Sequence, residues 1–228
     1  MKTILVTGAS GFLGTTVCQT FLLNKWQVVS LDRREPAHAQ TEDRFHFIRT
    51  DLLNEQQVEN AVQQAINRYD GIDAAALIAG GFDVGSLTET SSEDFKKMFD
   101  LNFVTALNVA RPLINYFKAD NIHGRIALVG GKPGLDSASA DWAAAYGLSK
   151  SLVFQLADYI NHFGKDSGIV AATIVPSIMD TPPNREAMPD DNPADWVSTQ
   201  QVADTIAFFC SDQGSALREP ILKVYGNS

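Results

Sequence analysis

A tyrosine and a lysine, one helical turn apart, are the side chains in this sequence with the clearest chemical potential. Tyr146 and Lys150 lie in Tyr-Gly-Leu-Ser-Lys, inside a helical pattern, so they share one face. A phenol has a reference pKa of about 10 and exchanges protons near neutral pH only when a nearby cation stabilises the phenolate. Lys150 can supply that charge. The pair indicates acid–base chemistry, although a core tyrosine beside a surface lysine gives the same spacing.

A glycine-rich turn near the start of the sequence indicates a bound phosphate group. Residues 7–14 read Thr-Gly-Ala-Ser-Gly-Phe-Leu-Gly, between an apolar run and a helical pattern. Such a turn lets the backbone approach a pyrophosphate and directs the free N–H groups of a helix N-terminus at it. The residues expected to contact a dinucleotide here are Gly8, Ser10, Gly11, Phe12 and Leu13.

Asp32 ends the next apolar run, about 20 residues further on, where a carboxylate would bind the ribose hydroxyls of a dinucleotide. A carboxylate repels a 2′-phosphate, so NAD, as NADH, is the preferred cofactor. Arg33 and Arg34 follow directly and could hold such a phosphate, or they could be solvated loop residues. NADP therefore stays open as an alternative.

The elements that must position these residues alternate between short apolar runs and longer helical patterns. Strands are expected at Ile4–Val6, Gln27–Leu31, Phe45–Arg49, Ala74–Ile78, Arg125–Val129, Ile169–Val175 and Ile221–Tyr225, and helices near Phe12–Leu23, Glu55–Arg68, Ser92–Phe117, Trp142–His162 and Thr199–Cys210. The last of these helices is expected to begin with a capping box at Ser198-Thr199-Gln200-Gln201. This alternation predicts an α/β fold, a doubly wound and mostly parallel sheet of about seven strands with helices on both faces, the Rossmann fold. We expect one domain over residues 1–228. Its proline-rich, helix-poor stretch indicates a substrate lid around residues 177–197.

Composition excludes several classes of partner. The net charge is −9, which provides no basic field for nucleic acid or an anionic membrane. No apolar run approaches the roughly 20 residues that span a bilayer, and the first strand leaves no room for a signal peptide, so a cytoplasmic location is expected.

Cys18 and Cys210 are interpreted as buried free thiols. The four histidines lack metal-ligand spacing, and no metal site is expected.

The sequence resembles the short-chain dehydrogenase/reductase family along essentially its whole length. The matching pieces follow the family order: the glycine-rich turn, Asp32, Asp51-Leu52, Ala79-Gly80-Gly81, Asn102, Tyr146 with Lys150, and Pro176 to Thr181. The resemblance implies a hydride-transferring oxidoreductase with Tyr146 and Lys150 as its catalytic pair. It also implies that Asp51 and Leu52 flank the adenine, Ala79–Gly81 pass under the ribose, and Lys150 holds the nicotinamide ribose. Pro176, Ile178 and Thr181 would lie in the loop that binds the carboxamide, and Arg33 would lie beside the adenosine ribose.

Asn102 has two interpretations. By its position alone it is a helix-interior amide bonded to backbone. In its family position it resembles the residue that holds a water for a proton relay beyond Lys150, and we therefore count it with the catalytic residues.

One piece of the family pattern is absent. A serine normally follows the fifth strand and donates a hydrogen bond to the substrate oxygen, but Gly131 stands there. Ser137 or Ser139 could replace it.

A branch of the family, the dihydropteridine reductases, also lacks this serine and resembles this chain at Ala79 to Phe82, at Gly131 to Asp136 and along Val175 to Pro189. The resemblance implies an NADH-dependent reductase of quinonoid dihydropterins, with Phe82, Gly131 and Tyr146 at the substrate. Phe82 could stack on a flat bicyclic ring.

Two further functions compete with this one. A general carbonyl reductase or alcohol dehydrogenase would need Ser137 or Ser139 as the second donor. A non-catalytic NAD(P)-binding redox sensor would not need Tyr146, Lys150 and Asn102 together. Every alternative implies a small-molecule ligand, and the resemblance suggests a homodimer or homotetramer, in which the Ser92–Phe117 and Trp142–His162 helices pair. Trp142 and Trp196 could line the substrate pocket, but core or lid packing is the preferred interpretation.

Overall fold

Parallel strands form the central layer of the protein. The computed structural model describes residues 1–36, 43–136, 138 and 141–227. In sheet order the strands are β3 (Phe45–Arg49), β2 (Gln27–Asp32), β1 (Thr3–Thr7), β4 (Ala74–Leu77), β5 (Arg125–Val129), β6 (Val170–Pro176) and β9 (Ile221–Val224). Each neighbouring pair is parallel. The expected seven-stranded Rossmann sheet is confirmed, with strand ends that differ from the expected ones by at most one residue.

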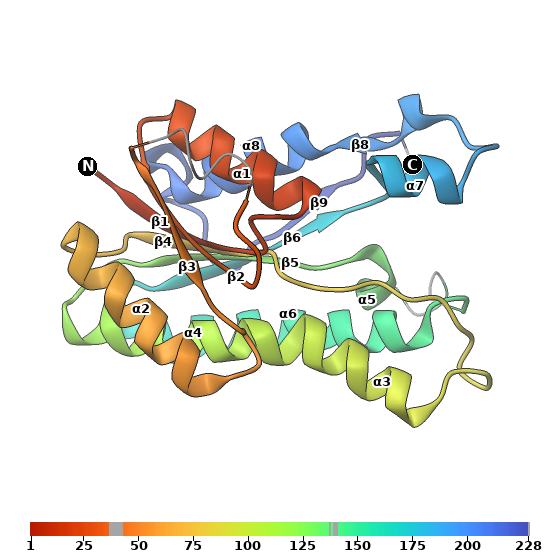
Figure 1. The fold of residues 1–228 in the computed structure, drawn as a ribbon, viewed down its shortest axis with the longest axis horizontal. Coiled ribbons are helices and arrows are strands. Elements are labelled where there is room, and N and C mark those ends of the chain that lie inside the picture. Colours follow the sequence, from red (N-terminus) through yellow and green to blue (C-terminus); the bar gives the residue numbers. More distant parts are fainter. Residues whose placement is uncertain (37–42, 137, 139–140, 228) are drawn as a thin grey trace.

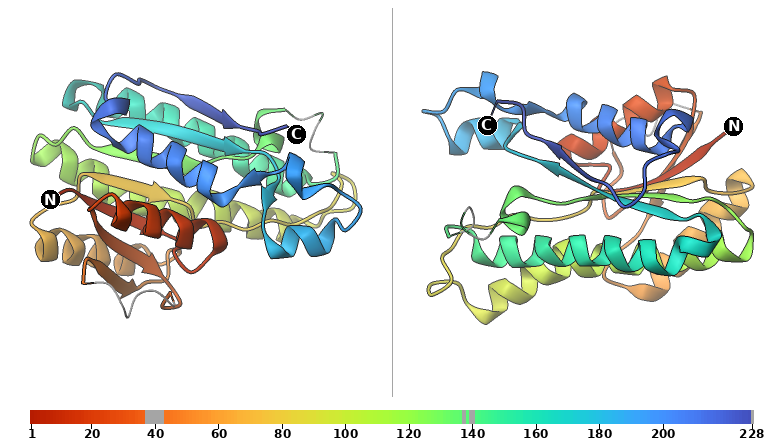
Figure 2. Two further views of the ribbon diagram at one scale, coloured as in Figure 1. Left: turned by 90° about the horizontal axis from the view of Figure 1, so that it is seen from above. Right: turned by 180° about the vertical axis from the view of Figure 1, so that it is seen from behind.

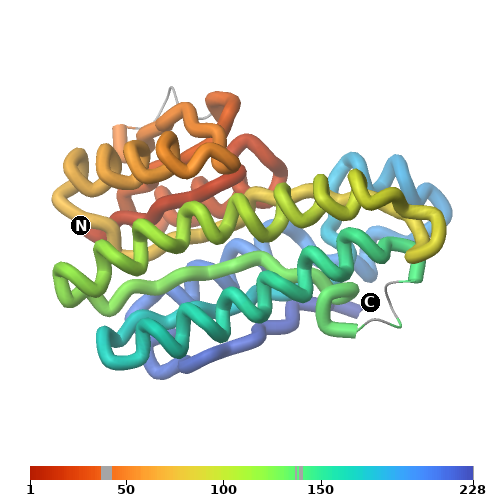
Figure 3. Tube along the Cα trace, turned by 90° about the horizontal axis from the view of Figure 1, so that it is seen from below, coloured from red at the N-terminus to blue at the C-terminus, as the bar shows by residue number. Residues whose placement is uncertain are grey.

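Helices cover both faces of this sheet (Figure 1). One face carries α1 (Phe12–Leu23) and α8 (Thr199–Cys210), and the other carries α2 (Glu55–Tyr69), α4 (Thr105–Ala119) and α6 (Ala144–Gly164). Figure 2 shows the same two layers from above and from behind, and Figure 3 shows α4 and α6 side by side. Both faces of the strands are thus buried, which explains why the strand sequences are almost continuously apolar.

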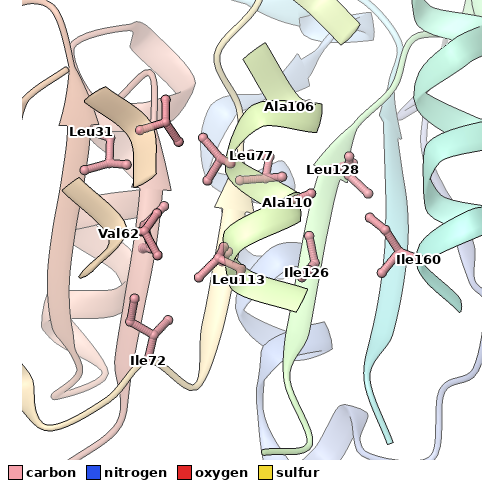
Figure 4. Close-up of a cluster of buried hydrophobic side chains, with 14 of the residues drawn as sticks. Leu31, Val62, Ile72, Leu77, Ala106, Ala110, Leu113, Ile126, Leu128 and Ile160 are labelled. Carbon is pink, nitrogen blue, oxygen red and sulfur yellow. The ribbon is translucent and has the colours of Figure 1, made fainter. Parts of the chain in front are cut away.

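Each face of the sheet has its own hydrophobic cluster. The cluster under α2, α4 and α6 includes Leu31, Leu77, Leu113, Leu128 and Ile160 (Figure 4). The cluster under α1 and α8 includes Val6, Val17, Phe21, Ala127 and Phe209. Cys18 on α1 and Cys210 on α8 are buried and free, which confirms the expected state of the thiols.

The strand order reverses between β1 and β4, because β2 follows on one side of β1 and β4 lies on the other. In open sheets of this kind, ligands bind outside the carboxyl ends of the strands at such a reversal. The glycine-rich turn follows β1 and Ala79–Gly81 follow β4. The topology therefore brings these two segments, far apart in sequence, to the same crevice.

The helix expected over Ser92–Phe117 is not continuous. The structure divides it into α3 (Ser92–Phe99), a π-helical turn (Asp100–Val104) and α4. Thr105 N–H donates to the Asp100 carbonyl across the wide turn. Asn102 lies in the middle of this turn and is buried. Its amide bonds to another segment, and a π-bulge inside a helix is often found at functional sites.

The helix expected from Trp142 begins instead at Ala144. Trp142 and Ala143 are held in an extended bridge with Gly85, which removes them from the helix. A short helix, α5 (Lys132–Leu135), precedes this region. At its other end α6 continues to Gly164, followed by a 3₁₀ turn at Lys165–Ser167.

The stretch after β6 is not helix-poor, and that expectation was wrong. It contains β7 (Met179–Asp180), α7 (Pro182–Ala187), a 3₁₀ turn at Pro193–Asp195 and β8 (Val197–Ser198), which pairs with β7. Proline at the first helical positions suits α7, since its missing N–H has no intrahelical partner there. The expected capping box at Ser198 and Gln201 is present at the start of α8, and a 3₁₀ turn at Asp212–Gly214 follows that helix.

Candidate active site

The turn after β1 is shaped by contacts that leave no room for side chains. Gly8 has φ +68°, and a Cβ there would lie 3.0 Å from the Ala79 backbone. A Cβ at Gly14 would lie 2.0 Å from the Gly8 carbonyl oxygen. Helix α1 starts after Gly11 without a side-chain cap. The first N–H groups of the helix therefore receive no bond from a capping side chain, as a phosphate-binding helix N-terminus requires.

Asp32 joins the end of β2 to this turn. Its Oδ2 accepts from Ser10 N at 3.0 Å and Ser10 Oγ at 2.7 Å, while its Oδ1 accepts from Arg33 N at 2.6 Å. Each carboxylate oxygen has further lone-pair capacity. The structure thus places Asp32, Ser10 and Arg33 together beside the glycine-rich turn.

Asp51 and Leu52 follow β3 and form a tight turn. Asp51 Oδ1 accepts from Leu53 N at 3.1 Å, and Leu52 is buried. The Leu52 carbonyl accepts a hydrogen bond of 2.9 Å from Asn108 Nδ2 on α4. We did not single out Asn108 from the sequence, although its buried position inside an amphipathic helix is a signal that could have identified it.

The loop after β4 is clamped from both sides. Thr7 Oγ1 accepts from Ile78 N at 3.0 Å and from Ala79 N at 3.1 Å. Asn102 accepts from Gly81 N and donates to Gly81 O, both at 3.0 Å. A Cβ at Gly80 would lie 2.5 Å from Asn102 Oδ1. The close approach of Asn102 therefore accounts for Gly80, whereas a Cβ at Gly81 would meet Leu101 Cδ1 at 2.7 Å.

Asn102 also reaches α6, the helix that carries Tyr146 and Lys150. Its Nδ2 donates to Ser149 Oγ at 3.0 Å, and Ser149 Oγ donates to the Tyr146 carbonyl at 2.8 Å. The Asn102 side chain is thus engaged with Gly81 and Ser149, which matches the structural interpretation of this amide. Its role with a relay water stays a prediction.

Tyr146 and Lys150 lie on one face of α6, as their spacing predicts. Lys150 is buried and Nζ donates to the Val129 carbonyl at 2.8 Å. Nζ lies 5.8 Å from the centre of the Tyr146 ring. Burial lowers the pKa of Lys150 to about 8 and raises the pKa of Tyr146 to about 12. Without a cofactor the phenol therefore keeps its proton at neutral pH.

Gly131 lies directly against the tyrosine hydroxyl. A Cβ at this position would lie 2.6 Å from Tyr146 Oη, so the hydroxyl occupies space that a serine side chain would need. The backbone of Gly131 is extended, with φ −162°, and strain does not explain the glycine. Ser137 and Ser139, the proposed substitutes, lie outside the described residues, as does His38.

An aromatic group surrounds the other side of the tyrosine. Phe82 packs edge-to-face on Tyr146 with ring centres 5.0 Å apart, and Trp142 lies 5.8 Å from Phe82. Phe82 is 57% exposed and Trp142 is 53% exposed. Trp142 therefore does not serve core packing, because the bridge to Gly85 holds it out of the core; its packing against the lid stays a prediction. Trp196, in contrast, is buried.

The loop after β6 brings its expected residues to the same edge of the sheet. Pro176 ends β6, and Ile178 O accepts from Val197 N at 2.9 Å. Thr181 is buried and forms the N-cap position of α7. Asp180 and Arg185 form a bidentate ion pair with bonds of 2.6 and 2.8 Å, which lowers the pKa of Asp180 and fixes α7 to the loop.

The described residues lack two other kinds of feature, a metal-binding cluster and a membrane-spanning helix. No group of three or more His, Cys, Asp or Glu residues positioned to hold a metal occurs in the part of the chain that the structure describes. Across residues 1–36, 43–136, 138 and 141–227, no helix combines the length and apolar character needed to cross a bilayer.

Comparisons with known proteins agree with this geometry. A family model described as short chain dehydrogenase matches residues 2–192. Dihydropteridine reductase from Dictyostelium discoideum is 27% identical over 212 residues, covering 90% of this chain and 86% of the relative. Acetoacetyl-CoA reductase from an Acinetobacter strain is 25% identical over 190 residues, covering 79% and 75%. The solved structure titled ElxO with NADP bound has a TM-score of 0.90 at 21% identity, covering 99% and 97%.

Fold, motif order and family match define the class of the protein: it is an oxidoreductase that uses a nicotinamide cofactor. The chain belongs to the short-chain dehydrogenase family.

Proposed function

We propose that this chain is an NADH-dependent reductase of flat, conjugated acceptors, with quinonoid dihydropterin as the leading substrate. The observation that carries the proposal is the contact between Gly131 and Tyr146. Because a Cβ would lie 2.6 Å from the tyrosine hydroxyl, residue 131 supplies no side-chain donor and the tyrosine occupies its place. Resemblance to the dihydropteridine reductase relative supports the same substrate class.

The absent donor discriminates between substrates. Reduction of an isolated ketone builds an alkoxide, and losing one of two donors to it costs on the order of 10²-fold or more in rate. A quinonoid dihydropterin spreads the incoming electron pair over its conjugated ring. It takes up one hydride and one proton to give the tetrahydropterin, and no localised alkoxide forms. One donor, Tyr146, is then enough.

The residues at the strand reversal fit a dinucleotide. The uncapped start of α1 would receive the pyrophosphate, Asp32 the adenosine ribose, and Lys150 the nicotinamide ribose. A reduced nicotinamide supplies the hydride. Asp32 disfavours a 2′-phosphate, which supports NADH, whereas the neighbouring Arg33 and Arg34 are the residues that would favour NADPH.

Tyr146 and Lys150 handle the proton. Burial holds the pKa of Tyr146 at about 12, so the hydroxyl is protonated and ready to donate from Oη. Lys150 is buried beside it, and its charged form stabilises the phenolate that remains. Both groups lie on one face of α6, so the helix holds their backbone positions one turn apart.

Two assembly features belong to the same proposal. The segment 177–197 would act as a lid over the substrate, with β7, β8 and the Asp180–Arg185 pair as its rigid base. A homodimer or homotetramer would bury the apolar groove between α3 and α6, which is lined by Phe95, Phe99, Leu148 and Leu152. Leu148 is 54% exposed, and pairing of two chains over this groove would remove it from water. The sedimentation coefficient of Leu148→Glu against the parent tests this surface.

The direct test is NADH oxidation against quinonoid dihydrobiopterin, simple ketones and quinones. We expect turnover of the pterin to exceed that of any isolated ketone by at least about tenfold. Gly131→Ser serves as the matched variant. The serine must displace the Tyr146 hydroxyl, so pterin reduction should fall, while ketone reduction should rise only if the new hydroxyl reaches the substrate. Fast ketone turnover by the parent protein contradicts the proposal.

A carbonyl reductase is the second candidate, favoured by the acetoacetyl-CoA reductase relative. It requires Ser137 or Ser139 as the missing donor. Ketone turnover that collapses in Ser137→Ala or Ser139→Ala would establish it. Tight NADH binding without turnover of either substrate class would instead favour the redox sensor.

A further inference from the structure

Phe82 and Trp142 lie on separate segments of the chain, yet they form one exposed aromatic surface beside the catalytic tyrosine. Phe82 follows β4 and Trp142 precedes α6. Their ring centres are 5.8 Å apart at an interplanar angle of 57°, and both side chains are more than half exposed. Large aromatic rings left in water next to a reactive group are typical of a ligand contact surface.

Main-chain hydrogen bonds fix the two segments to each other. Gly85 N donates to the Trp142 carbonyl at 2.7 Å, and Ala144 N donates to the Gly85 carbonyl at 2.9 Å. Gly85 has φ +150°, and a Cβ there would lie 2.4 Å from Thr90 Oγ1. The bridge therefore depends on glycine, and it holds the two segments that carry the rings together before any ligand arrives, which reduces the entropic cost of binding.

The charges around the two rings disfavour an anionic ligand. Asp83 follows Phe82 and is paired with Lys97 at 3.0 Å. Asp141 precedes Trp142 and is exposed, and the chain as a whole carries a charge of −9. The Asp83–Lys97 pair carries no net charge and Asp141 is negative, so a carboxylate or phosphate group on the substrate would gain no favourable charge from these side chains. A neutral planar ring would gain apolar contact and offset or edge-to-face stacking.

We propose that Phe82 and Trp142 form a preorganised platform, held by the Gly85–Ala143 bridge, that selects neutral planar rings as acceptors for Tyr146. This inference rests on the proposed function and adds Trp142 as a specificity-determining residue. The contact of Phe82 with Tyr146 at 5.0 Å places any ring stacked on the platform next to the proton donor.

A binding experiment separates this inference from the proposed reaction. Tyr146→Phe protein saturated with NAD⁺ is titrated calorimetrically with fully oxidised biopterin, which undergoes no hydride transfer. Adding Trp142→Leu or Phe82→Leu should weaken binding about tenfold each, since each removes one aromatic stacking contact and its buried area. Trp142→Phe should cost less than Trp142→Leu, because it keeps a ring.

Phe208→Leu is the matched control, because Phe208 is 46% exposed but lies on α8, on the other face of the sheet. It should leave binding unchanged. Gly85→Ala retains both rings while straining the bridge, so it should weaken biopterin binding with no loss of NAD⁺ affinity. The exposed positions of both rings mean that the leucine variants should keep the parent melting temperature.

The two hypotheses fail in different ways. Pterin turnover that is insensitive to both leucine variants overturns the platform while leaving the reaction intact. Ring binding that depends on Trp142 without any turnover supports the platform and contradicts the proposed reaction. Absence of measurable biopterin binding, or equal binding by parent and leucine variants, overturns the platform.

Discussion

The turn after β1 and the loop after β5 both begin where a strand of the same sheet ends, but they depend on glycine in different ways. At Gly14 the neighbour that excludes a side chain is a backbone carbonyl oxygen, 2.0 Å from where a Cβ would lie; at Gly131 it is the Tyr146 hydroxyl, at 2.6 Å. The main chain itself fixes the cofactor side of the site. On the substrate side, the Tyr146 side chain occupies the volume next to residue 131 and can move, so this side can accommodate a substitution more easily.

The largest expected effect comes from removing the proton donor alone. Tyr146→Phe should lower kcat by on the order of 10²-fold or more while the dissociation constant of NADH stays within about twofold. Steady-state kinetics and NADH fluorescence titration measure the two quantities. Lys150→Ala is the contrasting variant, expected to damage both, since Lys150 serves the ribose and the tyrosine. Parent-like turnover in Tyr146→Phe would remove the tyrosine from the mechanism.

Placing alanine at each of the two glycines tests the comparison directly. In Gly14→Ala the methyl group meets a carbonyl that cannot rotate away, so the free energy of unfolding should fall by about 1–3 kcal/mol and NADH should bind at least about tenfold more weakly. In Gly131→Ala the tyrosine ring can shift, so stability and NADH affinity should stay near the parent while kcat falls about tenfold. Denaturant unfolding and NADH titration distinguish the two variants. Equal losses of stability would show that the two sides of the site are equally rigid.

The pH dependence of NADH binding reports on Lys150. Burial lowers its pKa to about 8 in the free protein, whereas hydrogen bonding of the ammonium group to ribose hydroxyls favours the charged form in the complex. Affinity for NADH should therefore be constant below pH 8 and fall by up to about tenfold per pH unit above it, until the pKa of the complex is reached. Titrations from pH 6.5 to 9.5 test this. In Lys150→Met the slope should vanish, and a flat profile in the parent would contradict it.

The smallest expected effect concerns the choice of cofactor. Asp32 should make NADH bind about tenfold more tightly than NADPH, because its carboxylate repels a 2′-phosphate. Replacing Asp32 with serine should narrow this ratio severalfold, or reverse it through Arg33 and Arg34. Competitive fluorescence titration measures the ratio. Tighter binding of NADPH to the parent would show that the arginines dominate over Asp32.

Local patterns in the sequence predicted the parts of the fold that depend on interactions within one strand or one helix. Apolar runs located all seven strands of the sheet, and the Ser198–Gln201 capping box located the start of α8. The π-turn around Asn102 was not predictable, because it depends on a hydrogen bond to Gly81, which lies on another segment. The late start of α6, at Ala144 instead of Trp142, depends in the same way on Gly85. Such tertiary contacts override the helical pattern without leaving a periodic signal.

The residues of the candidate site fall into the same two groups, those that a local pattern reveals and those that depend on contacts between distant segments. Tyr146, Lys150 and the glycine-rich turn were accessible because their spacing within one element carries the chemistry. Ser149 was missed, since its importance arises from Asn102 in the π-helical turn. Trp142 was interpreted mainly as a packing residue, because the sequence does not show its contact with Phe82 in the loop after β4. The close approach of Tyr146 to Gly131 could not be inferred either, because the sequence shows a missing serine without showing what fills its volume.

The two buried cysteines give the protein an internal reporter. Cys18 and Cys210 lie on α1 and α8, the helices that cover one face of the sheet. Burial raises the pKa of both thiols, so neither reacts as a thiolate in the closed state. A thiol reagent can label them only when this helical layer opens. The rate of labelling therefore measures how often the layer of α1 and α8 opens. The change in that rate when NADH is added measures how strongly the bound cofactor stabilises this layer, because α1, the helix that follows the glycine-rich turn, belongs to it.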